Sequence, residues 1–346
     1  MADILILGGT RNLGHVTALA LLEAGHNVSV MNRGATPDEL PPDVHRLRGD
    51  RADSNQMRRA ISGRDFDLIL DTTTYTGADA RSAIDIFQGH VGRYVFVSTG
   101  QVYLVRERIS RPFREESYEG PVMPEPPRES EDYDSWTYGA WKRDAEDGFA
   151  AAFARDAFPV TTIRLPMVAS ERDHYGRVQA YAARLLDANA ILVPDERGLP
   201  LRHVYVGDVA RLIVRLTESH DGLGRTYNIS YGESMSLSEF LEMLAAVVQS
   251  PLDIERVPRG ELTEAGLLPH CSPFSERWMS ELDNTRSLAE LGEGKLSYTG
   301  PGNYLPLLVD DYVQRWTRNN MVPSGYDQRA KEKEFVDQRR RSAKRT

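Results

Sequence analysis

The first fourteen residues combine a short apolar run with a glycine-rich turn, and this pairing restricts the fold more than any other feature of the sequence. Residues 4–7 are continuously apolar, as expected of a strand covered on both faces of a parallel sheet. The turn that follows reads Gly8-Gly9-Thr10-Arg11-Asn12-Leu13-Gly14, and apolar residues then recur at helical spacing as far as Ala24. Glycine permits the tight turn, and the next helix offers unpaired N–H groups at its N-terminus to a pyrophosphate. This order of elements predicts a dinucleotide-binding unit.

The same alternation of strand and helix continues along the N-terminal half. Further strand patterns occupy residues 27–31, 67–70 and 94–97, and helical stretches precede the last two. Repeated β-α-β units predict an α/β fold with a doubly wound parallel sheet of the Rossmann type. The second half mixes strand patterns at 160–163, 201–206 and 227–229 with amphipathic helices at 207–217 and 236–248.

These patterns predict three regions. A dinucleotide-binding domain spans residues 1–165 and includes a long loop at 106–136, which is rich in Pro, Glu and Arg. A smaller mixed α/β region at 166–325 binds the substrate and returns some segments to the main sheet. Residues 326–346 are expected to be a basic, disordered tail, with an interaction arm as the alternative.

Composition excludes several classes of protein. The formal charge is −9, from 42 basic and 51 acidic residues, which disfavours a dedicated nucleic-acid binder. The single cysteine, Cys271, excludes an internal disulfide framework and fits a reducing compartment. No apolar stretch reaches the roughly 18 residues that a membrane span needs. A cytoplasmic protein is expected. No histidine pair has metal-ligand spacing, so no metal site is expected.

The residues after the second and third strands bear on the choice of cofactor. The second strand ends in Met31-Asn32-Arg33-Gly34, without the Asp or Glu that usually holds the adenosine ribose of NAD. Arg33 and Arg11 are cations that suit a 2′-phosphate, or else two solvated arginines. Asp50 is placed to accept a hydrogen bond from the adenine amino group. The pattern favours NADP and leaves NAD open.

A second group of residues has the chemistry of proton transfer. Thr99 ends a predicted strand, and Tyr138 and Lys142 lie four residues apart on one face of a predicted helix at 137–153. A nearby ammonium favours the phenolate form of a tyrosine, and it can also hydrogen-bond a nicotinamide ribose. A threonine hydroxyl can hold the substrate oxygen. Such a unit oxidises an alcohol or reduces a ketone beside a hydride carrier. A surface Tyr–Lys pair is the alternative, but the order of glycine turn, strand-end threonine and helical Tyr-x-x-x-Lys favours the catalytic interpretation.

In this order of motifs the sequence resembles the extended branch of the short-chain dehydrogenase/reductase superfamily, over residues 3–318. The Gly-Gly-Thr-Arg turn, Asn32-Arg33-Gly34 and Gly49-Asp50-Arg51 are similar to an atypical subgroup that includes chloroplast stem-loop-binding proteins and bacterial epimerase-like reductases. The resemblance implies that Thr99, Tyr138 and Lys142 are catalytic and that the protein forms a homodimer. Motifs and resemblance together assign cofactor contacts to Gly8, Thr10, Arg11, Asn12, Leu13, Gly14, Asn32, Arg33, Asp50, Arg51, Thr72, Thr73, Tyr138, Lys142, Pro166 and Val168.

Departures from the family pattern bear on the substrate. Gly100-Gln101 stands where sugar dehydratases carry Asp-Glu, which removes the acid and base needed to eliminate water. Met167 replaces a substrate-binding Asn, and Arg202 is displaced by one position from the family's phosphate-binding Arg. Tyr75, Gln101 and Arg202 are expected to contact a small-molecule substrate.

The expected function is an NAD(P)-dependent epimerase that acts through a transient ketone on a nucleotide sugar, nucleoside or polyol. An NADPH-dependent ketone reductase and a non-catalytic nucleotide- or RNA-associated protein are the alternatives.

Overall fold

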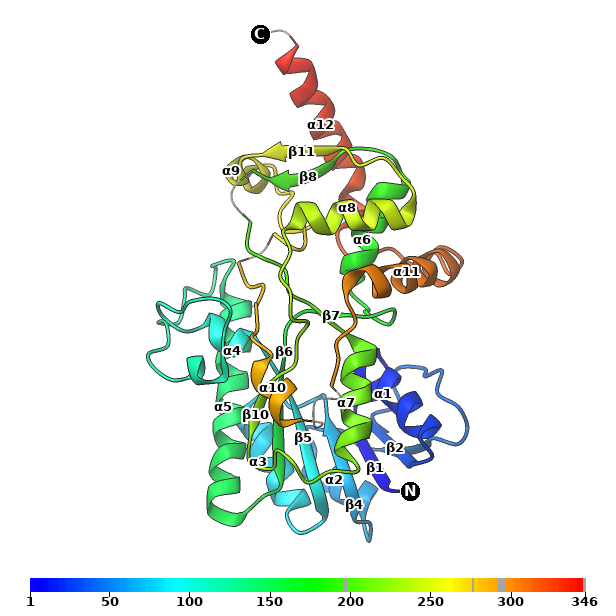
Figure 1. The fold of residues 1–346 in the computed structure, drawn as a ribbon, viewed down its shortest axis with the longest axis vertical. Helices are drawn as coiled ribbons and strands as arrows, with labels where there is room; N and C mark the ends of the chain where they lie inside the picture. The colour runs from blue at the N-terminus through cyan, green and yellow to red at the C-terminus, as the bar shows by residue number, and fades with distance from the viewer. Residues whose placement is uncertain (196–197, 276, 292–295, 345–346) are drawn as a thin grey trace. The chain divides into compact units, whose positions relative to one another are not determined.

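The computed structural model describes residues 1–195, 198–275, 277–291 and 296–344 (Figure 1). The chain divides into two compact units, each assembled from three stretches of sequence. Unit 1 comprises residues 1–172, 203–232 and 280–298, and unit 2 comprises residues 173–202, 233–279 and 299–346.

Unit 1 is built on a seven-stranded parallel sheet with the order β10-β6-β5-β4-β1-β2-β3. The strands are β1 (Asp3–Leu7), β2 (Asn27–Asn32), β3 (His45–Arg48), β4 (Phe66–Asp71), β5 (Val91–Thr99), β6 (Val160–Leu165) and β10 (Thr226–Asn228). The order reverses between β1 and β4, and the carboxyl ends of strands at such a point form the usual ligand crevice. The predicted doubly wound sheet is confirmed.

Helices cover both faces of this sheet because its strands alternate apolar side chains on both sides. Ile4 and Ile6 of β1 pack in one core cluster with side chains of α1 and α7. Leu5 and Leu7 point to the other face and pack with side chains of α2, α3 and α5. The helices of unit 1 are α1 (Asn12–Glu23), α2 (Ser54–Ile61), α3 (Gly77–Phe87), α4 (Gln101–Leu104), α5 (Tyr133–Asp156), α7 (Val206–Leu216) and α10 (Thr285–Glu290).

The stretch predicted as a long loop is more ordered than expected. It contains a 3-10 turn, η1 (Glu115–Tyr118), and a bridge between Arg106 and Val122. Phe113 exchanges backbone hydrogen bonds with residues 281 and 283, at 2.7 and 2.8 Å. Helix α5 begins at Tyr133 rather than at residue 137. The remaining pair in unit 1 joins β7 (Val168–Ala169) to β9 (Val204–Tyr205).

Unit 2 is a smaller mixed α/β assembly around a parallel pair of strands, β8 (Ile191–Pro194) and β11 (Ile254–Val257). Its helices are α6 (Arg177–Leu186), α8 (Leu237–Val248), α9 (Arg259–Glu264), α11 (Pro301–Asp311) and α12 (Arg329–Ala343), with a π-helical turn at Tyr312–Trp316 and a 3-10 turn at Tyr326–Gln328. No helix among the described residues is long and apolar enough to cross a membrane.

The prediction of a disordered tail at 326–346 is wrong for the residues that the structure describes. Most of this segment is helix α12, and its Glu332 is completely buried against Arg184 of α6. Arg339 and Arg340 pair with acidic groups of β11, α9 and the residue before β11, namely Glu255, Glu261 and Asp253. The basic residues of this segment therefore pair with acidic residues about 80 positions earlier in the sequence. The composition of the segment alone does not reveal these partners. Residues 345–346 lie outside the described part.

Candidate active site

The turn between β1 and α1 requires glycine for steric reasons. Gly8 has a φ of +110°, and a Cβ atom there would lie 2.4 Å from Oγ1 of Thr72. A Cβ at Gly14 would lie 2.6 Å from the backbone nitrogen of Gly9. Helix α1 has no capping side chain and no acidic residue in its first turn. Its first N–H groups are therefore left for an anionic ligand, as in dinucleotide-binding turns.

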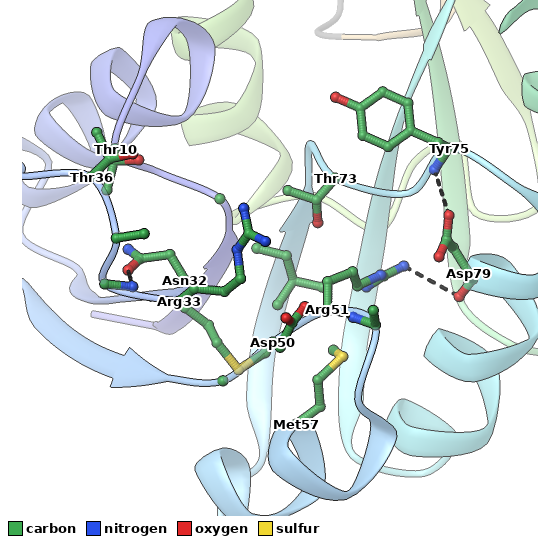
Figure 2. Close-up of a pocket in the computed structure, with 17 residues that line it drawn as sticks. Thr10, Asn32, Arg33, Thr36, Asp50, Arg51, Met57, Thr73, Tyr75 and Asp79 are labelled. Carbon is green, nitrogen blue, oxygen red and sulfur yellow. Dashed lines mark hydrogen bonds between the residues drawn. The ribbon is translucent and has the colours of Figure 1, made fainter.

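A cavity of about 400 Å³ opens beside this turn, at the carboxyl ends of β1, β2, β3 and β4. Figure 2 shows Arg33, Asp50 and Arg51 near the middle of the group that surrounds it. Seven of the predicted cofactor residues line the cavity: Gly8, Thr10, Asn32, Arg33, Asp50, Arg51 and Thr73. Tyr75, predicted as a substrate contact, also lines it. Its lining does not include seven other predicted cofactor contacts: Arg11, Asn12, Leu13, Gly14, Thr72, Pro166 and Val168.

Several polar atoms around this cavity lack a partner within the described residues. They are Nδ2 of Asn32 and both Nε and Nη1 of Arg51, all of them buried. Buried donors of this kind are normally satisfied in proteins, so their presence indicates that a polar ligand completes the site. The volume, the glycine turn and the unpaired donors fit the adenosine and phosphate portion of a dinucleotide.

The adenosine end of the cavity is basic. Arg33 lines it, and Arg11 donates from Nη2 to Oγ1 of Thr36 at 3.2 Å, beside the cavity. Arg48 was missed by sequence reasoning: it ends β3, pairs in register with Asn32 and donates to Oδ1 of Asn32. Its position at the carboxyl end of a strand next to β2 is the signal that identifies it. Asp50 lines the cavity and accepts from the N–H of Ala52 at 2.9 Å.

The predicted catalytic residues come from two neighbouring elements of unit 1. Thr99 is the last residue of β5, and its Oγ1 accepts from the N–H of Gln101 at 3.3 Å. Lys142 lies on α5, and its Nζ donates to the carbonyl oxygens of Thr74 at 2.6 Å and Val97 at 2.8 Å. Since Val97 is two residues before Thr99, these bonds fix the lysine against the end of β5.

Aromatic rings surround the Lys142 ammonium. Its Nζ lies 6.0 Å from the ring centroid of Tyr138, 5.1 Å from that of Tyr75 and 4.8 Å from that of Phe96. The rings of Tyr75 and Tyr138 are 6.2 Å apart. The structure therefore brings the predicted Tyr–Lys pair together with Tyr75. It excludes the alternative of a surface pair for Lys142, which is only 3% exposed.

Burial lowers the pKa of Lys142. Loss of hydration disfavours the charged amine and lowers the pKa of Lys142 to about 8, against the opposing attraction of Asp71 and Glu146. A pKa in this range keeps most of the ammonium charged at pH 7 and leaves it sensitive to its neighbours.

Two buried acidic residues behind the site were not predicted. Glu146, one turn after Lys142, accepts from Nε of Arg164 at 3.1 Å and from the hydroxyl of Ser98. Asp71 ends β4 and is completely buried. Each is paired with an arginine that is distant in the sequence, Asp71 with Arg51 and Glu146 with Arg164. The only signal in the sequence is therefore a carboxylate at the end of a buried strand or on the buried face of a helix.

The other predicted residues lie as follows. Gln101 begins α4, Pro166 follows β6 and Val168 begins β7, all in unit 1. Arg202 belongs to unit 2, where its Nε donates to Oγ of Ser234 at 3.0 Å. No group of three or more metal-ligating side chains occurs within the described ranges.

The fold and this site define the class: an NAD(P)-dependent enzyme of the extended short-chain dehydrogenase/reductase type. Residues 4–230 match the NAD dependent epimerase/dehydratase family, and the chain belongs to that family. UDP-glucose 4-epimerase of Corynebacterium glutamicum is 22% identical over 322 residues, which cover 83% of this chain and 93% of the relative.

The chain is also similar to a shorter part of a second relative and, in fold, to a solved structure. Chloroplast stem-loop binding protein of 41 kDa b from Arabidopsis thaliana is 29% identical over 116 residues, or 29% of this chain and 30% of the relative. The crystal structure of the Bordetella bronchiseptica enzyme WbmH in complex with NAD+ is similar in fold, with a TM-score of 0.69 and 20% identity over 91% of this chain and 99% of WbmH.

Proposed function

We propose that the protein is an epimerase that acts through a transient ketone on a nucleotide sugar, a nucleoside or a related polyol. The observation that carries the proposal is the buried Lys142 ammonium beside Tyr138 at the end of β5. Gly100 and Gln101, in place of an acid pair, argue against dehydration. The similarity to a UDP-glucose 4-epimerase over most of both chains supports the same choice.

Each side chain has a distinct role in this proposal. Tyr138 takes the proton of the substrate hydroxyl and returns it to the ketone oxygen. Lys142 stabilises the phenolate of Tyr138 and orients the cofactor ribose, and Thr99 holds the substrate oxygen. The dinucleotide, held by the glycine turn, Arg33, Asp50 and Arg51, supplies hydride transfer when bound. Epimerisation requires that the hydride return to the opposite face of the ketone.

The test of this proposal is cofactor retention. An epimerase regenerates its cofactor in each cycle, so the purified protein is expected to hold about one dinucleotide per chain and to need none added. The measurement is the absorbance and mass spectrum of the small molecules released by denaturation. If the protein is free of dinucleotide and consumes added NADPH stoichiometrically, the result contradicts the epimerase and supports the ketone reductase. The basic residues at the adenosine end of the cavity are also compatible with a reductase that uses NADPH.

We further propose that the preferred cofactor is NADP. Arg33 in the cavity, Arg48 on Asn32 and the absence of a carboxylate at the end of β2 support a 2′-phosphate. Replacing Arg33 by alanine is expected to weaken NADP binding roughly 10- to 100-fold, since a charge-assisted hydrogen bond contributes about 1.5–3 kcal/mol, and to change NAD binding little. Calorimetric titration of both dinucleotides measures this. Exposed Arg64→Ala is the control, and tighter binding of NAD than NADP by the wild type contradicts the preference.

The RNA-associated alternative has less support. Its main basis was the basic C-terminal segment, and Arg339 and Arg340 of that segment are paired with acidic groups. The homodimer and the cytoplasmic location stay predictions.

A further inference from the structure

The carboxylate of Asp71 is the centre of a buried network that joins the adenosine cavity to Lys142. Oδ1 of Asp71 accepts from the N–H and hydroxyl of Thr73, at 2.7 and 3.0 Å, and from the N–H of Thr74 at 3.0 Å. Oδ2 accepts from the hydroxyls of Thr74 and Tyr94. One carboxylate therefore fixes the backbone after β4, including Thr74, whose carbonyl holds the ammonium of Lys142.

Arg51 binds the same carboxylate from the side of the cavity. Its Nη2 lies 2.9 Å from Oδ2 of Asp71, and it also donates to Oγ1 of Thr74. A further bond from Arg51 to the carbonyl of Asp79 is drawn in Figure 2. Burial alone would raise the pKa of Asp71, but the guanidinium of Arg51 and the hydroxyls around the carboxylate outweigh it and hold this pKa below its usual value. Asp71 is therefore an anion although it is completely buried.

We propose that Asp71 is a positioning residue, which fixes the Thr74 carbonyl under Lys142 and supplies the negative charge that keeps this lysine protonated, while Arg51 opposes that charge from the cofactor cavity. The part that concerns catalysis rests on the proposed function, because it assumes that Lys142 serves Tyr138. The structural part does not, because it concerns the titration of one lysine in the free protein.

The charges that face Lys142 are few. Asp71 at the end of β4, Glu146 on α5 and Asp79 on α3 favour the ammonium, and Arg51 disfavours it. Glu146 is itself neutralised by Arg164. The rings of Tyr75, Tyr138 and Phe96 complete its surroundings. Asp71 and Arg51 therefore carry opposite charges, and removal of one or the other is expected to shift the pKa of Lys142 in opposite directions.

The experiment is a direct titration of Lys142 by NMR on lysine labelled at Cε. It is practical because the chain has only five lysines, Lys142, Lys295, Lys331, Lys333 and Lys344, and Lys142→Arg assigns the signal. In Asp71→Asn the midpoint of the Lys142 titration is expected to fall by about one pH unit or more, because an anion is lost and the positive charge of Arg51 is left without its counter-charge. In Arg51→Met the midpoint is expected to rise, and the double variant is expected to lie near the wild type.

The direction in which Asp71→Asn shifts the Lys142 midpoint distinguishes an effect of the Asp71 charge from an effect of lost structure. A loosened site admits water and moves the midpoint upward, toward the usual 10.5 of lysine. An unchanged or raised midpoint in Asp71→Asn therefore overturns the proposal. If Asp71→Asn does not fold, an unchanged or lowered midpoint in Arg51→Met overturns it instead. Asp67→Asn, an exposed position on the same strand, is the matched control and is expected to leave the midpoint unchanged.

A second measurement distinguishes this inference from the proposed function. If Lys142 must be charged for catalysis, the alkaline limb of the kcat profile moves with its midpoint, to lower pH in Asp71→Asn and to higher pH in Arg51→Met. Midpoints that move as expected while the kcat profile stays fixed overturn the catalytic part and support the charge network in the free protein.

Discussion

Replacement of Tyr138 by phenylalanine is expected to lower kcat by about 10²- to 10⁴-fold, the usual contribution of a positioned acid–base group. The substitution removes only the hydroxyl that we propose exchanges a proton with the substrate. The ring that lies near Tyr75 and Lys142 is kept, so dinucleotide binding is expected to stay within a few-fold of the wild type. Steady-state turnover and calorimetric titration of the cofactor measure the two effects separately.

Tyr133→Phe is the matched control for this variant. It makes the same substitution five residues earlier on α5, at a half-buried position. Turnover by Tyr133→Phe is expected to equal that of the wild type within a factor of about two, because it removes no group of the candidate site. Full activity in Tyr138→Phe would show that proton transfer depends on another group and would remove the basis of the enzymatic mechanism.

Replacement of Glu332 by alanine is expected to reduce the free energy of unfolding by about 3–5 kcal/mol. Glu332 and Arg184 are both completely buried, and Nε of Arg184 lies 3.0 Å from Oε2 of Glu332. Arg329 donates to the same carboxylate at 2.8 Å. Removal of this single anion leaves Arg184 in the interior of unit 2 without its counter-charge. Denaturant unfolding followed by circular dichroism measures the loss.

Two further variants test whether the pairing is the cause. Glu334→Ala makes the same change two residues later on α12 at an exposed position, and its effect is expected to stay within about 0.5 kcal/mol. Arg184→Met with Glu332→Leu removes both charges and is expected to be more stable than Glu332→Ala, because no unpaired charge is left buried. If Glu332→Ala is as stable as Glu334→Ala, then α12 does not depend on this ion pair.

The parts of the molecule that depend on local sequence patterns were predictable. Residues 4–14 contain the strand, the glycines and the start of α1, so the turn follows from steric rules that act over a few positions. The Tyr138–Lys142 pair was equally accessible, because residues four apart lie on one face of a helix. The cavity beside Arg33 and Asp50 follows from the order of parallel strands, which the repeated β-α-β pattern indicates.

The remaining features depend on pairs that are distant in the sequence. Asp71 and Arg51 are 20 positions apart and Arg184 and Glu332 are 148 apart, so no local pattern links the members of either pair. Composition was misleading for α12, because its basic residues appear solvated until their acidic partners on β11 and α9 are known. Long-range charge pairing is therefore what single-sequence reasoning missed in both units.

The interleaving of the two units has a consequence for biosynthesis. Strand β10, at the edge of the seven-stranded sheet, and helix α7, on one of its faces, both come from residues after 203. A nascent chain that ends near residue 165 therefore has the glycine-rich turn and the two elements that carry the proposed catalytic residues, β5 and α5. Its β6 edge is open and part of one apolar face of the sheet is uncovered. Such an intermediate exposes the kind of surface on which aggregation starts. Because unit 1 also includes residues 280–298, the ribosome must release about 300 residues before this half of the enzyme can close, so an isolated N-terminal fragment is a poor substitute for the whole chain.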